Sequence, residues 1–282
     1  MKTIISIILI LLLCAMPMSA CSKETEVKIK IMSFNIRTLT LEDNPINNWE
    51  NRKEDVLSTI LKYDADLIGF QELKQSKYNF LQQNLTAYNF YGVDRIGPNL
   101  SESVAIFYKK DRFELLSYKT FWLSETPDVV SMGWDAGVQR TCTVMKFKDI
   151  ISGEVITHIN THFDNRGEIA RANSADMILD EVSKTEGAFV VTGDFNLSEG
   201  SEVYNHLTET LDDTKYLAPE GMSDSGGTTQ SFGLSSPTLP IDYVFINKDY
   251  FDTLSYSIIR DTDGEGNYPS DHFPLIVELQ YK

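Results

Sequence analysis

The 282-residue sequence has few cysteines and few basic residues, and both shortages limit what the protein can be. Of three cysteines, Cys14 and Cys21 lie near the start of the chain and leave Cys142 alone in the remainder, so disulfides cannot hold the fold together. Lysine and arginine number 25 against 41 aspartates and glutamates, for a net charge of −16. Repulsion of a polyanion therefore disfavours duplex DNA as a partner, although a local basic pocket can still hold one phosphate.

The sequence also lacks internal repeats of the solenoid type, long low-complexity segments and a convincing linker. Hydrophobic residues make up 42% of the chain and aromatic residues 11%, which is typical of a globular protein with its own core. The roughly 260 residues that follow the N-terminal segment are enough for one large domain. We therefore expect a single monomeric domain over residues 28–282.

The first 20 residues have the features of a secretory signal peptide. Lys2 precedes an apolar run over residues 4–16, shorter than the about 20 residues that span a bilayer. Residues 18–21, MSAC, resemble a bacterial lipobox with methionine in place of the usual leucine. We therefore expect a lipoprotein-type signal over 1–20 and a tether over 21–27. Acylated Cys21 would anchor an exported protein in outer-membrane lipid, on the periplasmic side or at the cell surface.

Hydrophobic periodicity predicts strands and helices in mixed order. Strands are predicted at 27–36, 66–72, 103–108, 113–122, 140–147, 155–160, 189–194, 241–246 and 274–280. Helices are predicted at 48–62, 76–85 and 168–184. The looser region 198–236 is expected to hold small helices and a hairpin. This order indicates an α/β sandwich with more than one sheet.

Polar side chains follow a buried strand in residues 189–196, FVVTGDFN. The apolar run ends at Gly193, and Asp194 and Asn196 then lie on the rim of the sheet. Asp and Asn are ordinary turn residues, so this segment alone is equally consistent with a simple turn.

The same feature recurs at other strand boundaries. Some polar residues end a predicted strand and others open one, so they share one rim only if the second group of strands runs antiparallel to the first. Eight such residues are better explained by a site than by eight separate turns. They are Asn35, Glu72, His162, Asp194, Asn196, Asp242, Asp271 and His272.

The sequence resembles the endonuclease/exonuclease/phosphatase superfamily through six motifs in chain order. These are MSFNIR, GFQEL, NTHFDN, VVTGDFN, IDYVF and SDHFPLIVEL. The resemblance implies a DNase-I-like, four-layer α/β/β/α sandwich with two mixed β-sheets, a divalent metal (Mg²⁺ or Mn²⁺) and hydrolysis of a phosphoester. The segments TFWLSETP and GWDAGVQR also resemble a bacterial exported branch of this superfamily.

The resemblance also implies a role for each motif residue. A hard cation prefers oxygen ligands, which suits Glu72 as the main carboxylate with Asn35 and Asp271 beside it. His272 would activate water, and Asp242 would orient its ring.

The remaining motif residues would act on the phosphate. His162 would donate to a non-bridging oxygen, while Asp194 and Asn196 would position water or the leaving group. Arg140 either clamps the phosphate or makes a surface salt bridge. Arg171 would support the site from its helix.

Two tryptophans and one aspartate have two alternative roles each. Trp122 and Trp134 either stack on a base or sugar or pack in the core. Asp164 either orients the His162 ring or begins the next turn.

We therefore expect a divalent-metal-dependent hydrolase of a phosphomonoester or phosphodiester, and the acidic composition favours a small phosphorylated compound or single-stranded nucleic acid over duplex DNA. One alternative is a phospholipid phosphodiesterase such as a sphingomyelinase, which a lipid anchor would keep close to bilayers. The other is a non-catalytic surface-binding lipoprotein that retains the fold. Fold alone does not choose among these.

Overall fold

The computed structural model describes residues 26–38, 45–236 and 238–282. The predicted signal peptide and Cys21 lie outside these residues. None of the described helices is long and apolar enough to cross a membrane.

Six strands form a first sheet in which β1 and β2 are parallel and all other neighbours are antiparallel. In spatial order they are β11 (Phe251–Ile258), β12 (Leu275–Tyr281), β1 (Lys28–Asn35), β2 (Leu67–Lys74), β4 (Glu102–Lys109) and β3 (Tyr88–Asp94).

A second sheet repeats this arrangement, with β7 and β8 as its parallel pair. In spatial order it holds β5 (Phe113–Trp122), β6 (Thr141–Asp149), β7 (Val155–His162), β8 (Ala188–Asp194), β10 (Asp242–Ile246) and β9 (Asp212–Asp213).

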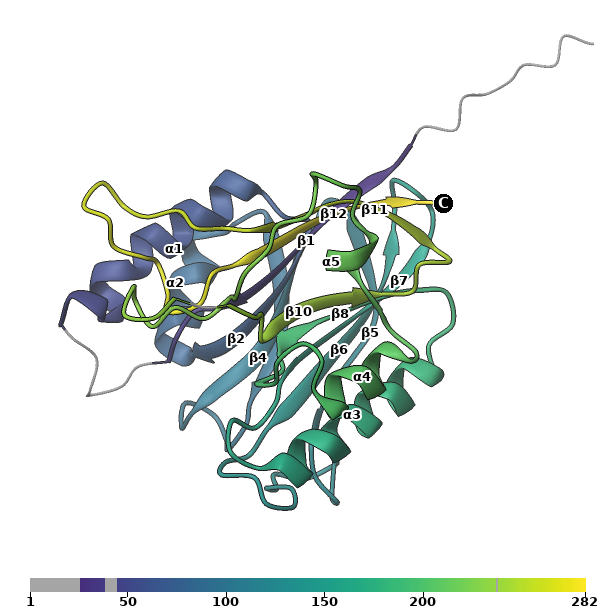
Figure 1. Cartoon of the computed structure of the whole chain (residues 1–282), viewed down its shortest axis with the longest axis horizontal. Helices are drawn as coiled ribbons and strands as arrows, with labels where there is room; N and C mark the ends of the chain where they lie inside the picture. The colour runs from purple at the N-terminus through teal and green to yellow at the C-terminus, as the bar shows by residue number, and fades with distance from the viewer. Residues whose placement is uncertain (1–25, 39–44, 237) are drawn as a thin grey trace, which may run out of the picture.

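The two sheets pack face to face, and helices cover their outer faces (Figure 1). On the first sheet, α1 (Trp49–Tyr63) and α2 (Gln75–Asn84) bury Val56 and Leu81 against the strands. On the second sheet, α3 (Glu168–Ser183) and α4 (Glu202–Thr208) do the same with Ile178 and Leu207. Two short helices, η1 (Pro45–Asn47) and α5 (Thr214–Leu217), lie in connections. The predicted four-layer sandwich with two mixed sheets is confirmed.

Alternation along the strands decides where the polar residues lie. Every second side chain of β1 points to the opposite sheet, and Ile29 and Ile31 accordingly join the core between the sheets. Continuing this face along the strand leads to Asn35. On β8 the same rule leads from Val190 in the core to Asp194. The interior is therefore apolar along most of the sandwich and polar where β1 and β8 end.

Three features differ from the sequence predictions. Strands β3 and β11 were not predicted, because both are edge strands whose partly exposed residues do not form a long apolar run. The described part of region 198–236 contains α4, β9 and α5 but no hairpin, since β9 pairs with β10 instead.

Candidate functional site

The predicted site residues meet at one end of the sandwich. Strand β10 runs antiparallel to β8 and pairs Asp242 with Asp194, and β12 runs antiparallel to β1. The residues that open these two strands therefore lie beside those that end β1, β2, β7 and β8, as expected. They come from both sheets, so the site bridges the end of the sandwich and does not follow the edge of a single sheet.

A pocket of about 590 Å³ opens at this end. Its walls include most of the predicted residues, namely Glu72, Arg140, His162, Asp194, Asn196, Asp271 and His272. Asn35 and Asp242 are buried immediately behind this wall and contact residues of the pocket. The sequence analysis assigned no role to several further lining residues, of which the first and the fifth end the motifs MSFNIR and NTHFDN: Arg37, Thr38, Arg95, Glu102, Asn165 and Arg166.

Glu72 reaches the pocket through an irregularity in β2. The pairing of β2 with β4 shifts register between Phe70 and Leu73, and Glu72 has a φ of 61°. In a regular strand Glu72 would share the outward face of Phe70, which packs with α1 and α2. The bulge turns this carboxylate toward the site, and a non-glycine residue in the left-handed region indicates strain retained for function.

Asn35 connects two carboxylates of the site. Its Nδ2 donates to Glu72 Oε1 at 3.1 Å and to Asp194 Oδ2 at 2.9 Å, while its Oδ1 accepts from the Arg37 backbone N–H at 3.0 Å. The second oxygen of Glu72 accepts a short hydrogen bond from the Thr38 N–H. Burial opposes ionisation of Glu72, but the hydrogen bonds from Thr38 and Asn35 outweigh it and hold its pKa below the ordinary value.

Asp271 lies against the same cluster. Arg37 Nη1 is 3.2 Å from Asp271 Oδ2, and Ser270 Oγ donates to the Asn35 carbonyl at 2.7 Å. Burial and then the nearby Glu72 raise the pKa of Asp271. Glu72, Asn35 and Asp271, the three predicted metal ligands, are therefore neighbours in space.

His272 and Asp242 form the predicted pair. His272 Nδ1 is 2.8 Å from Asp242 Oδ2, so Nδ1–H donates to this carboxylate and Nε2 faces the pocket, 3.8 Å from Asp194 Oδ2. Burial opposes protonation of His272, but Asp242, Asp194 and Asp271 outweigh it and raise its pKa well above the ordinary value.

Asp194 lies at the centre of the cluster. Its Oδ1 accepts from the Asn196 N–H at 3.0 Å, and His162 Nε2 is 3.4 Å from Oδ2. Burial and the charge of Asp242 raise the pKa of Asp194 to about 7. By contrast, burial and Arg140 lower the pKa of His162 well below its ordinary value, so His162 is neutral at pH 7.

Arg140 is buried and lines the pocket, so the alternative of a surface salt bridge was wrong. Its Nε is 3.5 Å from Asp164 Oδ2, and its Nη1 is 3.9 Å from Glu102 Oε1. Glu102 itself pairs closely with Arg95, at 2.6 Å. Because both contacts of Arg140 are long, its guanidinium retains hydrogen-bonding capacity for an anion in the pocket.

Asp164 begins the turn after β7 and does not orient the His162 ring. Its Oδ1 accepts from the N–H groups of Gly137, Arg166 and Gly167, at 2.8 to 3.1 Å. Arg171 Nη1 donates from α3 to the Asp164 carbonyl at 3.0 Å, so this side chain holds the turn from its helix. This turn fixes the wall of the pocket next to Arg140.

The two tryptophans and Asn196 each donate a hydrogen bond to the surrounding chain. Trp122 Nε1 donates to the Arg95 carbonyl at 2.7 Å, so this ring supports the wall. Trp134 has a φ of 44°, and its backbone N–H donates to Glu125 Oε2 at 3.2 Å. Asn196 Nδ2 donates to the Phe163 carbonyl at 3.0 Å, which fixes its amide at the edge of the pocket.

The donor set fits a divalent cation. Glu72 and Asp271 offer carboxylate oxygens, which hard cations prefer as ligands. Asn35 would add its amide oxygen once the side-chain amide turns over, because its Nδ2 faces Glu72 and its Oδ1 accepts from the Arg37 N–H. A second possible group, Asp194, Asp242 and His272, has ligand atoms within 4.8 Å of one another. Burial, and after it the neighbouring carboxylates Asp242 and Glu72, raise the pKa values of Asp194 and Asp271, and a bound cation would lower both.

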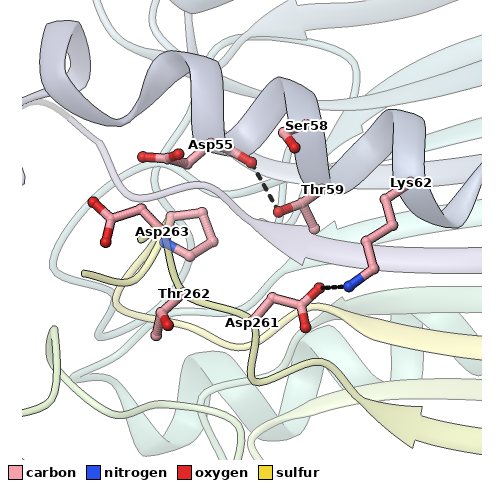
Figure 2. A pocket seen from close by; sticks show the side chains of 8 residues that line it. Asp55, Ser58, Thr59, Lys62, Asp261, Thr262 and Asp263 are labelled. Atoms are coloured by element: carbon pink, nitrogen blue, oxygen red, sulfur yellow. Dashed lines mark hydrogen bonds and ion pairs between the residues drawn. The ribbon is translucent and has the colours of Figure 1, made fainter. Parts of the chain in front are cut away.

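A separate cleft of about 220 Å³ lies between α1 and the loop before Asp271. Figure 2 shows Asp55 and Thr59 on the helix facing Asp261 and Asp263 on the loop. Its polar groups bond to one another, with Thr59 Oγ1 donating to the Asp55 carbonyl and Lys62 bound to Asp261. None of the predicted site residues lines this cleft.

Comparison with known proteins agrees with the motifs and the fold. Residues 32–272 match the model of the Endonuclease/Exonuclease/phosphatase family. A protein of this family from Bacteroides thetaiotaomicron is 29% identical in sequence, with a TM-score of 0.84 over 92% of this chain and 99% of that one. A mannosyl-6-phosphatase from the same organism is 30% identical, with a TM-score of 0.81 over 89% and 99%.

Among curated proteins, nocturnin of Mus musculus is 24% identical over 90% of this chain. The match spans 66% of the length of that protein. Since the family match covers most of the sequence, this chain belongs to the endonuclease/exonuclease/phosphatase family, whose members hydrolyse phosphoester bonds.

Proposed function

We propose that the protein is a divalent-metal-dependent phosphoesterase that acts on a small, soluble phosphorylated compound. The observation that carries this proposal is one pocket that combines three kinds of group. A cluster of oxygen ligands adjoins a His–Asp pair, and arginines with a neutral histidine line the same pocket.

Glu72, Asn35 and Asp271 would hold Mg²⁺ or Mn²⁺. When bound, the cation would neutralise charge that develops on the phosphoryl oxygens. The hydrogen bonds from Thr38 and Asn35 keep Glu72 ionised and fix its orientation toward the pocket.

His272 would take the proton of the attacking water at Nε2, because Nδ1 is already bound to Asp242. Asp242 fixes the tautomer and stabilises the imidazolium that forms. The raised pKa of His272 makes it a strong base but favours the protonated ring. Positive charge at the neighbouring carboxylates lowers that pKa, so metal loading and a neutral His272 support each other.

The wall that carries Arg140 and His162 would bind the phosphate. Arg140 can donate to two phosphate oxygens through its fork, and neutral His162 can donate one hydrogen bond from Nε2. Asp194 and Asn196 lie between this wall and His272, where they would position the water or the leaving group.

The shape and charge of the pocket favour a small substrate. Its basic residues are four arginines, Arg37, Arg95, Arg140 and Arg166, and no lysine is among its described lining residues. The whole chain is strongly acidic, which disfavours a long polyanion as substrate. The similarity to a mannosyl-6-phosphatase makes sugar phosphates the first substrates to test.

A hydrolysis screen tests this proposal. Hexose 6-phosphates, inositol phosphates, single-stranded nucleic acids and phospholipids are assayed with Mg²⁺, Mn²⁺ and excess chelator, and the Glu72→Ala variant is the control. We expect metal-dependent hydrolysis of a small phosphate ester and loss of metal affinity in a folded Glu72→Ala protein. Undiminished hydrolysis in excess chelator would contradict metal dependence. No hydrolysis of any substrate would instead favour the non-catalytic binding protein.

A further inference from the structure

We propose that Arg52 is a positioning residue, which holds the segments carrying Asn35 and Asp271 at the spacing that a divalent cation requires. This inference rests on the proposed metal site at Glu72, Asn35 and Asp271. Arg52 does not line the pocket and belongs to none of the family motifs described above.

Arg52 is a charged residue in the first turns of α1 with only 3% of its surface exposed. Its Nη1 donates to the Pro269 carbonyl at 2.5 Å and to the Ile36 carbonyl at 3.3 Å, and its Nε donates to the Asn47 carbonyl at 2.6 Å. Its guanidinium carbon also lies 5.2 Å from the centre of the Phe232 ring. One side chain therefore joins the end of β1, the turn before α1 and the loop before Asp271, and the last of these lies 217 residues along the chain from Arg52.

Two of these segments lead directly into the metal site. Ile36 follows Asn35 at the end of β1, and Pro269 precedes Ser270 and Asp271. Beyond Arg52, the two segments are joined by the hydrogen bond from Ser270 to the Asn35 carbonyl and by the ion pair of Arg37 with Asp271. Arg52 thus sets the distance between the backbones that carry two proposed ligands.

Packing cannot replace this contact, because the loop 261–269 is separated from α1 by the cleft described above (Figure 2). Polar contacts hold the two ends of the cleft. At the outer end, Lys62 and Tyr63 bind Asp261 at 2.6 and 3.0 Å. At the inner end, next to the site, Arg52 binds Pro269.

Arginine suits this position because its planar fork donates in fixed directions to several acceptors. A lysine has a single ammonium group on a flexible stem and cannot reproduce the fork. Lys77 Nζ already donates to the Ile36 carbonyl at 3.2 Å, yet in the described part of the chain it makes no hydrogen bond to Pro269. The connection between the two segments therefore depends on the guanidinium.

The test measures metal binding directly. Titration calorimetry with Mn²⁺ is performed on the full chain and on Arg52→Met, Arg52→Lys and two controls. Lys62→Met removes the outer contact of the same cleft, and Val277→Ala loosens β12 without touching the polar contacts. Thermal melts accompany each titration.

We expect Arg52→Met to bind Mn²⁺ at least about 10-fold more weakly, since residues that orient ligands typically change affinity by about 10- to 100-fold. The Mn²⁺ affinity of Arg52→Lys should lie between those of Arg52→Met and the wild type. Both controls should bind Mn²⁺ within about 2-fold of the wild type. At saturating metal, the KM of Arg52→Met should stay within about 2-fold, because the phosphate wall at Arg140 is unchanged.

Four results would overturn the inference. Unchanged Mn²⁺ affinity in Arg52→Met would show that Arg52 has no role at the metal site. An equal loss in Val277→Ala would show that any destabilisation has this effect. If Arg52→Met does not fold, wild-type Mn²⁺ affinity in Arg52→Lys would show that the metal site does not depend on the guanidinium. A wild type that hydrolyses phosphate esters without binding Mn²⁺ would reject the metal-dependent function itself, together with this inference.

Discussion

At the scale of single residues, His272 and Asp242 are predicted to act as one unit. If Asp242 fixes the tautomer and stabilises the imidazolium, removal of either residue breaks the same step. We expect Asp242→Asn and His272→Ala each to lower kcat by about 100- to 10,000-fold, the range typical of general-base catalysis. The double mutant should be little worse than the poorer single one, because residues that act as a unit are non-additive.

The measurement is kcat of the wild type, the two single variants and the double mutant on one substrate at saturating metal, with thermal melts to confirm folding. Metal affinity should stay close to normal in all of them, because neither residue is assigned as a main ligand. If the two single losses simply multiply, the residues act independently. Asp242 would then be reassigned to the metal, as its place in the group with Asp194 and His272 allows.

At the scale of strands, a buried polar network joins the two sheets just behind the site. Asn160 on β7 donates to the carbonyls of Phe70 and Ala105 on the first sheet, and its Oδ1 accepts from Gln71 and Thr192. This network requires β2 to approach closely, because a Cβ on Gly69 would lie 2.1 Å from Thr192 Oγ1 and 2.6 Å from Asn160 Oδ1.

Gly69→Ala should therefore destabilise the fold by about 1–3 kcal/mol, the usual range for overpacking a core, and displace the network. The matched control is Gly264→Ala, because a Cβ there meets nothing within 4 Å. Denaturant unfolding of both variants provides the measurement. A Gly69→Ala protein as stable as the control would show that the sheets can separate at no cost.

His158 on β7 contacts the same buried polar network, and its burial leads us to expect a loss of stability in acid. Its Nε2 is 2.8 Å from Thr192 Oγ1, and since that hydroxyl donates to Asn160, Nε2–H is the donor to Thr192. Burial lowers the pKa of His158 to about 3. In the unfolded chain the pKa is about 6.5, so the unfolded state binds the extra proton between these values.

The contribution of His158 to the free energy of unfolding is complete above about pH 6.5 and is lost as the pH falls toward 3. At pH 5 the loss is about 2 kcal/mol, from a difference of about 1.5 pH units at 1.36 kcal/mol each. His158→Gln cannot titrate, so its melting temperature should fall less between pH 7.5 and pH 5 than that of the wild type. Equal falls would show that other groups account for the acid sensitivity.

The same elements show why the sequence predicted the fold well and the site only in part. Apolar runs on β1, β7 and β8 identify inner strands, and their polar ends identify the site. The edge strands β3 and β11 lack such runs. The turn of Glu72 into the pocket depends on a register shift between β2 and β4, which is a property of pairing and not of local sequence. Arg52 was not identified as a site residue because its partners are backbone carbonyls. Every residue has such a carbonyl, so the sequence does not indicate which ones Arg52 contacts.

At the scale of the whole molecule, the position of the N-terminal segment bears on the choice of substrate. Strand β1 begins at Lys28 and ends at Asn35 in the site, and at about 3.3 Å per residue these ends lie roughly 23 Å apart. Figure 1 shows the start of β1 at the same end of the sandwich as the C-terminus, beside the end of β12. A chain tethered through residues 21–27 would therefore present the pocket away from its own bilayer.

The export prediction is tested first, by mass spectrometry of the native protein. We expect residues 1–20 to be absent and Cys21 to carry lipid. An intact Met1, or unmodified Cys21 in the membrane fraction, would contradict the lipoprotein-type signal.

The last prediction follows from this orientation. Because the pocket would face the aqueous phase, the acylated protein should hydrolyse a soluble sugar phosphate with the same kcat/KM, within about 2-fold, in detergent and after reconstitution into phospholipid vesicles. Phospholipids of those vesicles should not be cleaved, because with the chain anchored through Cys21 their headgroups would lie at the opposite end of β1 from Glu72 and His272. The assay follows phosphate release from the soluble substrate and headgroup release from the vesicles in the same sample. A tenfold fall in kcat/KM on reconstitution would place the pocket against the bilayer, and headgroup release would favour the phospholipid phosphodiesterase over the soluble-substrate enzyme.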